Sequence, residues 1–230
     1  MAVQWLTAFL DSPRDSDASA FWSALTATTL SPPRGVHGEF ATLLPRQGDA
    51  YLRVQDVGAA AAGCHLDVHV EDVEVALAQA LAAGAGVVAE PGGYAVLRSP
   101  GGFAFCLVPH HGESTRPRPV VWPGARASLV DQLCLDIPTA CFDVEATFWA
   151  RLTGWARRAG ALPEFDYLTR PTGMPLRILL QRLGPDDERR SVSGHPTSPA
   201  VTSRVSWPDI STSVPWSSRT SRAGSLFVIP

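Results

Sequence analysis

The stretch CHLDVHVEDVEVALAQALAAGAGVV, residues 64–88, changes its hydrophobic period halfway along. Its first part alternates aliphatic and polar residues, which is the pattern of a strand with one buried face. The aliphatic positions are Leu66, Val68 and Val70. From residue 73 onward the apolar residues recur at helical spacing, so a helix over about 72–83 follows the strand. His65 and His69 lie on the strand face opposite the aliphatic residues, and either could hold a metal.

The same order of elements occurs elsewhere in the chain. Residues 3–13, VQWLTAFLDSP, read as a strand, residues 16–27 as a helix, and residues 38–58 as a hairpin. After the helix at 72–83, residues 93–109 contain two strands around a Pro-Gly-Gly turn. Each series is a βαβββ module. One module leaves an apolar sheet face uncovered, so two must join to close a core.

A third module begins at residue 129. Three segments of the first module recur in it at a nearly constant offset of about 125 to 127 residues. Asp-Ser-Pro at 11–13 matches Asp-Ile-Pro at 136–138, Phe21-Trp22 matches Phe148-Trp149, and Val54-Gln55 matches Leu180-Gln181. We therefore expect an α+β protein with tandem domains at 1–109 and 128–230, joined by a proline-rich linker at 110–127. The repeated aromatic pairs are expected to be core residues that dock each helix on a sheet.

The last part of the chain departs from the repeat. A fourth module should follow Gly184 with a strand like HLDV, but from about Arg190 the chain is rich in serine and lacks a helical stripe, which predicts irregular structure. All basic residues are arginine, as in products of GC-rich genomes. A one-base shift over 217–224 would encode a sequence like VLRSPGG at 96–102. We hypothesise that the segment from about 190 is a frameshifted fourth module, which resequencing of the gene would test.

The amino-acid composition limits the kinds of partner that the protein can bind. The formal charge of −3 provides no basic field for nucleic acid or an anionic membrane. No apolar run reaches 18 residues and the N-terminus lacks signal-peptide features, so we expect a cytoplasmic protein. The four cysteines form no CxxC or Cys/His cluster and predict reduced thiols that contribute to packing. Small molecules are the expected partners, and a homodimer is one possible assembly.

The paired modules, with HLDVHVEDVEVALAQALAAGAGVV leading into VLRSPGGFAFCLV, resemble the glyoxalase, bleomycin-resistance and extradiol-dioxygenase proteins of the vicinal oxygen chelate superfamily. The segments VDQLCLDIP, FWARLTGW and PLRILLQRLG look like the two-domain glyoxalase-like proteins of actinobacteria. The resemblance covers residues 1–190. It implies a cup-shaped sheet around a small-molecule cavity, often with a divalent metal held by His, Gln or Glu.

Carried over position by position, the family's metal ligands in the first domain fall on Thr7, Gln55, His65 and Cys106. Only His65 is a good donor, and three or more are normally needed for a divalent metal such as Zn, Ni, Fe or Mn. In the second domain the first two positions fall on Gln132 and Gln181, and the third lies in the abnormal tail, where His195 is the only histidine. The fourth position has no counterpart.

Several other polar residues are candidates for a binding site. Gln55, Gln132 and Gln181 could recognise a ligand through amide hydrogen bonds, with packing roles as the alternative. Arg53 and Arg177 match between the repeats to within about one residue and could clamp a carboxylate or phosphate, with outward-facing arginines as the alternative. A metal shared by His65 and His69 is a further alternative. His110 and His111, at the start of the linker, are expected to face solvent.

Two classes of function fit these features. Because the metal set is degenerate, the favoured function is small-molecule binding in a cup, of the resistance or sequestering type. The alternative is a metal-dependent lyase, isomerase or dioxygenase in which the metal at His65 polarises a chelated oxygen pair. A third is an inactive paralogue or scaffold. Metal content would separate the first two.

Overall fold

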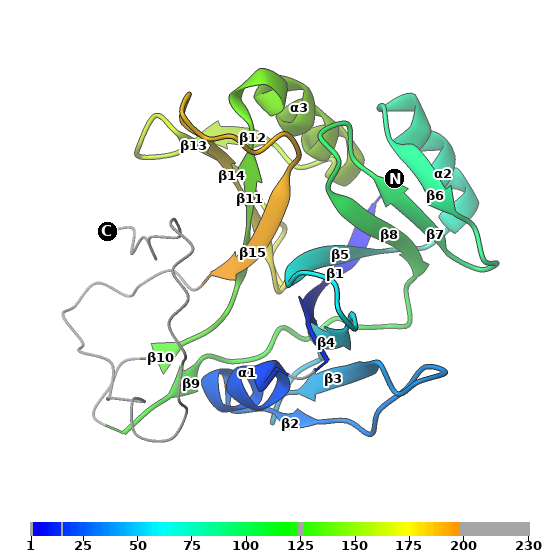
Figure 1. The fold of residues 1–230 in the computed structure, drawn as a ribbon, viewed down its shortest axis with the longest axis vertical. Coiled ribbons are helices and arrows are strands. Elements are labelled where there is room, and N and C mark those ends of the chain that lie inside the picture. The colour runs from blue at the N-terminus through cyan, green and yellow to red at the C-terminus, as the bar shows by residue number, and fades with distance from the viewer. Residues whose placement is uncertain (1, 15, 124–126, 198–230) are drawn as a thin grey trace.

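The computed structural model describes residues 2–14, 16–123 and 127–197 (Figure 1). Most of the first half forms one eight-stranded sheet, in the order β2-β3-β4-β1-β5-β8-β7-β6. Its strands are β1 (Val3–Ser12), β2 (Thr29–Leu30), β3 (Phe40–Leu44), β4 (Leu52–Asp56), β5 (Gly63–Val70), β6 (Gly86–Ala89), β7 (Ala95–Arg98) and β8 (Ala104–Pro109). The two predicted modules join where β1 and β5 pair antiparallel. The mixed α+β class and the hairpin of β3 and β4 are confirmed.

Each module of this sheet contributes a helix after its first strand. These are α1 (Ala18–Thr26) and α2 (Val73–Ala82). The change of period in the sequence coincides with a helix cap, because the Asp72 carboxylate accepts a hydrogen bond from the Val75 backbone N–H at 3.0 Å. No helix among the described residues is long and apolar enough to cross a membrane.

The second half forms a five-stranded sheet, in the order β12-β13-β14-β11-β15. Its strands are β11 (Gln132–Ile137), β12 (Arg157–Ala159), β13 (Phe165–Leu168), β14 (Arg177–Arg182) and β15 (Ser193–Thr197). The 3₁₀ turn η1 (Thr139–Cys141) leads into helix α3 (Phe142–Thr153). The third module therefore repeats the first.

The prediction of irregular structure from about residue 190 is wrong for β15. This strand pairs antiparallel with β11, as β5 pairs with β1, and so occupies the place of the first strand of a fourth module. A serine-rich segment without clear alternation can still form a strand when its neighbour offers a free edge. The rest of the proposed frameshifted segment, from residue 198, lies outside the described residues.

The linker is only partly irregular. Two short strands, β9 (Val120–Val121) and β10 (Ala127–Ser128), pair antiparallel, so the predicted boundary at 127 falls within a strand. Before β9, the Asp49 carboxylate accepts hydrogen bonds from the backbone N–H groups of Ser114 and Thr115, at 2.7 and 2.8 Å. The first part of the linker is therefore attached to the loop between β3 and β4.

The two halves share one hydrophobic core. The aromatic pair on α3, Phe148 and Trp149, is fully buried against two phenylalanines of the first half, and Figure 1 shows α3 beside the β7–β8 region. The ring centroid of Phe105 lies 5.7 Å from that of Phe148 and 5.3 Å from that of Trp149, and Phe103 lies 6.0 Å from Trp149. Such pairs contribute about 0.5–1.5 kcal/mol each beyond the area they bury.

The matching pair on α1 has a different environment. Phe21 is 52% exposed and Trp22 is partly buried, and no residue of α1 is fully buried. The prediction of core aromatics is therefore confirmed on α3 and wrong for Phe21. The reason is that the β7–β8 turn and β8 of the second module contact α3. The described residues include no equivalent strand pair from a fourth module to cover α1.

Candidate functional site

The side chains that alternate with the aliphatic core on β1, β4, β5 and β8 make up what we call the polar face of the first sheet. The register aligns Arg53 on β4, Phe9 on β1 and His65 on β5 in one row. The rings of Phe9 and His65 are stacked, with centroids 4.3 Å apart and an interplanar angle of 15°. The Arg53 guanidinium carbon lies 5.4 Å from the Phe9 centroid. Phe9 therefore separates two nitrogen-bearing side chains.

His65 is oriented by a carboxylate. Its Nδ1 atom lies 3.0 Å from Oδ2 of Asp11, and both side chains are 17% exposed. In the neutral ring, an Nδ1–H that donates to Asp11 leaves the lone pair on Nε2. Among the described residues, none hydrogen-bonds to Nε2. The ring can therefore offer Nε2 as an acceptor to a ligand.

Further along the polar face, side chains are engaged with each other. The Thr7 hydroxyl lies 2.9 Å from Nε2 of His69. Burial lowers the pKa of His69 well below its usual value, so its ring is neutral near neutral pH. On the next strand, the Cys106 thiol donates to the Asp67 carboxylate, and burial raises the pKa of Cys106 to about 12. Burial also raises the pKa of Asp67, although the nearby Arg53 guanidinium and the hydrogen bond from Cys106 oppose this shift.

These contacts decide whether the family's metal positions fit in the first domain. They do not, since the Thr7 hydroxyl is paired with His69 and the Cys106 thiol is held protonated. His65 is left as one strong donor beside the weak amide of Gln55. A divalent metal needs three or more donors, so these four positions do not form a metal site.

The remaining predicted residues lie on the second sheet and are separate from those on the first. The Gln132 amide donates to the Thr197 hydroxyl at 2.6 Å, and the Gln181 carbonyl lies 3.6 Å from the Cys134 sulfur. Arg177 lies 3.9 Å from the Asp131 carboxylate. The predicted candidates are thus divided between two sheets and do not form one site.

The register also corrects one proposed equivalence. Asp11 is paired with Gln55 and Asp136 with Gln181, which confirms the repeat match of the two glutamines. Two residues before each glutamine lie Arg53 and Leu179, so Arg53 corresponds to Leu179 and not to Arg177. Sequence similarity alone could not distinguish a true match from one shifted by two residues, because residues 177 and 179 point to the same face of the strand.

Sequence reasoning missed a contact between a carboxylate and an imidazole that recurs in both halves. Nδ1 of His195 on β15 lies 3.5 Å from Oδ2 of Asp136, as His65 lies beside Asp11. Burial works to raise the pKa of Asp136, but hydrogen bonds from His195 and Arg189 outweigh it and lower the pKa. The signal was present in the repeated aspartates before Ser-Pro and Ile-Pro, but their partners lie 54 and 59 residues further along the chain.

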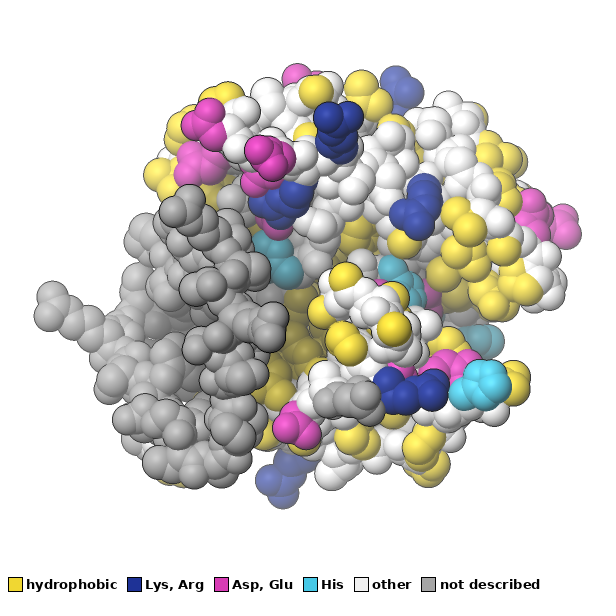
Figure 2. Space-filling view, viewed as in Figure 1, with side chains coloured by type: hydrophobic (Ala, Val, Ile, Leu, Met, Phe, Trp, Pro, Cys, Tyr) yellow, Lys and Arg dark blue, Asp and Glu magenta, His cyan; other side chains and the backbone are white. Residues whose placement is uncertain are grey.

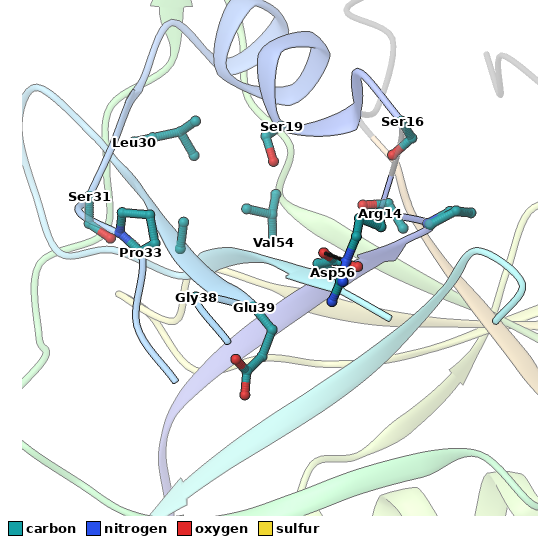
Figure 3. Close-up of a pocket in the computed structure, with 13 residues that line it drawn as sticks. Arg14, Ser16, Ser19, Leu30, Ser31, Pro33, Gly38, Glu39, Val54 and Asp56 are labelled. Carbon is teal, nitrogen blue, oxygen red and sulfur yellow. Dashed lines mark hydrogen bonds and ion pairs between the residues drawn. The ribbon is translucent and has the colours of Figure 1, made fainter. Parts of the chain in front are cut away.

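A cavity of about 320 Å³ lies away from these residues, between α1 and the β3–β4 end of the sheet (Figure 3). Val54 lines it and alternates with Arg53 and Gln55, so the cavity lies on the opposite side of the sheet from the polar face. Arg14 and Asp56 form an ion pair at 3.0 Å at its edge. Because α1 has no fully buried residue, the cavity reflects incomplete packing of this helix on the sheet.

The geometry of the first sheet agrees with a known family. A family model described as the glyoxalase-like domain matches residues 7–108. Residues 7–108 are therefore similar in sequence to glyoxalase-like domains. The described part of the chain has the fold of the vicinal oxygen chelate proteins, as the resemblance predicted. No curated protein sequence matches the chain significantly.

Solved structures with a similar fold are distant in sequence. A triple mutant of 4-hydroxymandelate synthase from Streptomyces coelicolor superposes with a TM-score of 0.57 at 17% identity, covering 79% of this chain and 63% of the synthase. The 2,3-dioxygenase LapB from Pseudomonas sp. KL28 gives 0.57 at 13% identity, with coverages of 84% and 73%. A fusion of a xylose isomerase-like TIM barrel with a 4-hydroxyphenylpyruvate dioxygenase gives 0.56 at 17% identity, with coverages of 84% and 35%. The chain spans less than two thirds of the synthase and of the fusion.

Proposed function

We propose that the protein binds a small organic molecule on the polar face of its first sheet. The observation that carries this proposal is the row of Arg53, Phe9 and His65, in which Asp11 orients the imidazole. Gln55 lies in the neighbouring row, opposite Asp11. A polar group held in place beforehand costs little entropy when a ligand binds, which favours recognition.

The row indicates the chemistry of the ligand. Arg53 and His65 are two strand spacings apart, about 9–10 Å, with the Phe9 ring between them. The Arg53 side chain is 30% exposed, and its nearest carboxylate, on Asp67, lies 3.5 Å away. A ligand that fits carries an anionic or hydrogen-bond-accepting group for Arg53, a proton donor such as a phenol for Nε2 of His65, and a flat apolar part between them.

A second candidate is a metal-dependent dioxygenase, lyase or isomerase, of which the names of the similar structures favour the dioxygenase. This activity would need a divalent metal, and the polar face supplies one strong donor at the family positions. We therefore favour binding or sequestration without catalysis. An inactive paralogue remains the third hypothesis, and it differs from the first in predicting that no ligand binds.

A ligand screen with matched variants tests the proposal. Aromatic carboxylates and phenols would be screened by thermal shift on the wild type, His65→Gln, Arg53→Gln and the control Arg158→Gln, an exposed arginine on β12. We expect at least one compound to raise the Tm of the wild type and the control, with the shift lost in the two polar-face variants. Equal shifts in all four proteins, or no shift from any compound, would contradict the proposal. Mass spectrometry of the bound compound after incubation distinguishes binding from turnover.

A further inference from the structure

A second cluster lies where the chain leaves the first sheet. His69 is the penultimate residue of β5 and pairs with Val108 on β8, and His110 follows the end of β8. A turn at Gly112 brings Glu113 back toward both rings. Oε2 of Glu113 lies 3.8 Å from Nδ1 of His69 and 3.3 Å from Nδ1 of His110. The expectation that His110 faces solvent is therefore wrong, since its side chain is 22% exposed.

The two imidazole nitrogens have no hydrogen-bond partner among the described residues. Nδ1 of His69 and Nδ1 of His110 are both buried and unpaired, and His69 as a residue is only 1% exposed. The other nitrogen of His69 is held by the Thr7 hydroxyl, so the unpaired atom points toward Glu113. Leaving a buried polar atom unpaired costs about 1–3 kcal/mol, so two beside one carboxylate indicate a missing partner.

The spacing of the three atoms fits a small cation. Ligands about 2.0–2.2 Å from a tetrahedral Zn²⁺ lie about 3.3–3.6 Å from each other. The separations of 3.3 and 3.8 Å between Oε2 of Glu113 and the two Nδ1 atoms are close to this range, and the three side chains can place donor atoms within 4.8 Å of one another. Two imidazole nitrogens and one carboxylate oxygen are a common donor set for Zn²⁺ and similar divalent metals.

We propose that His69, His110 and Glu113 bind one divalent transition-metal ion, with a fourth position open to water. The site is separate from His65, the one strong donor at the family positions, because His65 lies four residues earlier on β5, about 13 Å away along the strand. Thr7, at the first family position, contacts the other nitrogen of His69. It does not depend on the small-molecule ligand proposed above. It ties the start of the linker to the end of β5, next to the residues that Asp49 already holds.

A rival cluster in the second sheet is weaker. Cys134, Asp136 and His195 also place three donor atoms within 4.8 Å of each other. However, the Asp136 carboxylate already accepts a hydrogen bond from Arg189 at 2.8 Å, and burial raises the pKa of the Cys134 thiol. A metal there would have to displace an arginine and a proton.

Metal titration of the chelator-stripped full-length protein tests the proposal. We would titrate Co²⁺ and Zn²⁺ into the wild type, His110→Ala and Glu113→Gln, with His111→Ala, His65→Ala and Cys134→Ser as controls. His110 and Glu113 are chosen over the buried His69 because their side chains are partly exposed, so their loss should be tolerated in folding. The Co²⁺ spectrum reports the ligand type in addition to the affinity.

We expect one equivalent of metal in the wild type and all three controls, affinity at least about 10-fold weaker in His110→Ala and Glu113→Gln, and no thiolate-to-cobalt charge-transfer band. Equal affinity in His110→Ala, Glu113→Gln and the wild type would indicate adventitious binding and overturn the proposal. So would loss of binding in His65→Ala or Cys134→Ser, or absence of binding in the wild type.

Discussion

Glu145 on α3 connects the two halves of the molecule, and its removal should destabilise both. Its carboxylate is fully buried and accepts hydrogen bonds from the Gly101 backbone N–H and from the Trp149 indole N–H, both at 2.7 Å. In Glu145→Ala both donors lose their partner, at about 1–3 kcal/mol each. Because the carboxylate's own desolvation cost is recovered, we expect a net loss of about 2–4 kcal/mol in the free energy of unfolding.

Urea unfolding followed by tryptophan fluorescence measures this loss. Val144→Ala, the exposed neighbour on the same helix, is the control and should change stability by less than about 0.5 kcal/mol. A loss below about 1 kcal/mol in Glu145→Ala would show that water or another group replaces the carboxylate, and would refute the reasoning.

The same residue predicts a pH dependence. Burial raises the pKa of Glu145 above its usual 4.5, although the hydrogen bonds from Gly101 and Trp149 oppose the shift. A raised pKa in the folded state gives a stability contribution that is fully present below the usual value and lost as the pH rises through the folded pKa. The stability difference between the wild type and Glu145→Gln should therefore be largest in mild acid and shrink toward neutral pH. A difference that grows with pH would contradict the assignment.

Three further results are expected. With a pKa of about 12, Cys106 has roughly 1000-fold less thiolate than a free cysteine at pH 8. Iodoacetamide should therefore leave Cys106 unlabelled until urea is added, as detected by mass spectrometry. Gly194→Ala would place a Cβ 2.6 Å from the Phe103 ring, so chemical denaturation should show a loss of about 1–3 kcal/mol in the free energy of unfolding. The control Gly86→Ala, whose Cβ meets no atom within 4 Å, should keep a stability near that of the wild type. The buried Tyr51 hydroxyl donates to the Val130 carbonyl at 2.6 Å, so Tyr51→Phe should cost about 0.5–1.5 kcal/mol by the same assay, and an unchanged stability would mean that the bond adds nothing.

Hydrophobic periodicity and the internal repeat were enough to predict the modules and the hairpin of the first domain. Both signals are local or recur at a fixed offset, so one sequence contains them. The pairing of side chains was not predictable in the same way. Asp11 meets His65 across 54 residues, and whether such a pair forms depends on strand register. The polarity of the segment around β15 concealed a strand whose formation depends on the edge of β11.

Glu113 was missed for a different reason. Sequence reasoning treated His110 and His111 as the exposed start of a linker, because three prolines and little periodicity follow them. The turn at Gly112 reverses the chain and brings Glu113 beside His69, which lies 44 residues earlier. A Gly between a His pair and a Glu was the available signal, and it is too common to stand alone.

The shared core has a consequence for how the gene can be divided. The match to the glyoxalase-like domain ends at residue 108, but Phe103 and Phe105 near that end are covered by α3 from the next repeat. A fragment cut at residue 109 would present both rings to water and would associate with other chains through them. The end of the matched segment and the edge of the shared hydrophobic core therefore fall at different places, and engineering of this chain should exchange α3 together with the residues it covers.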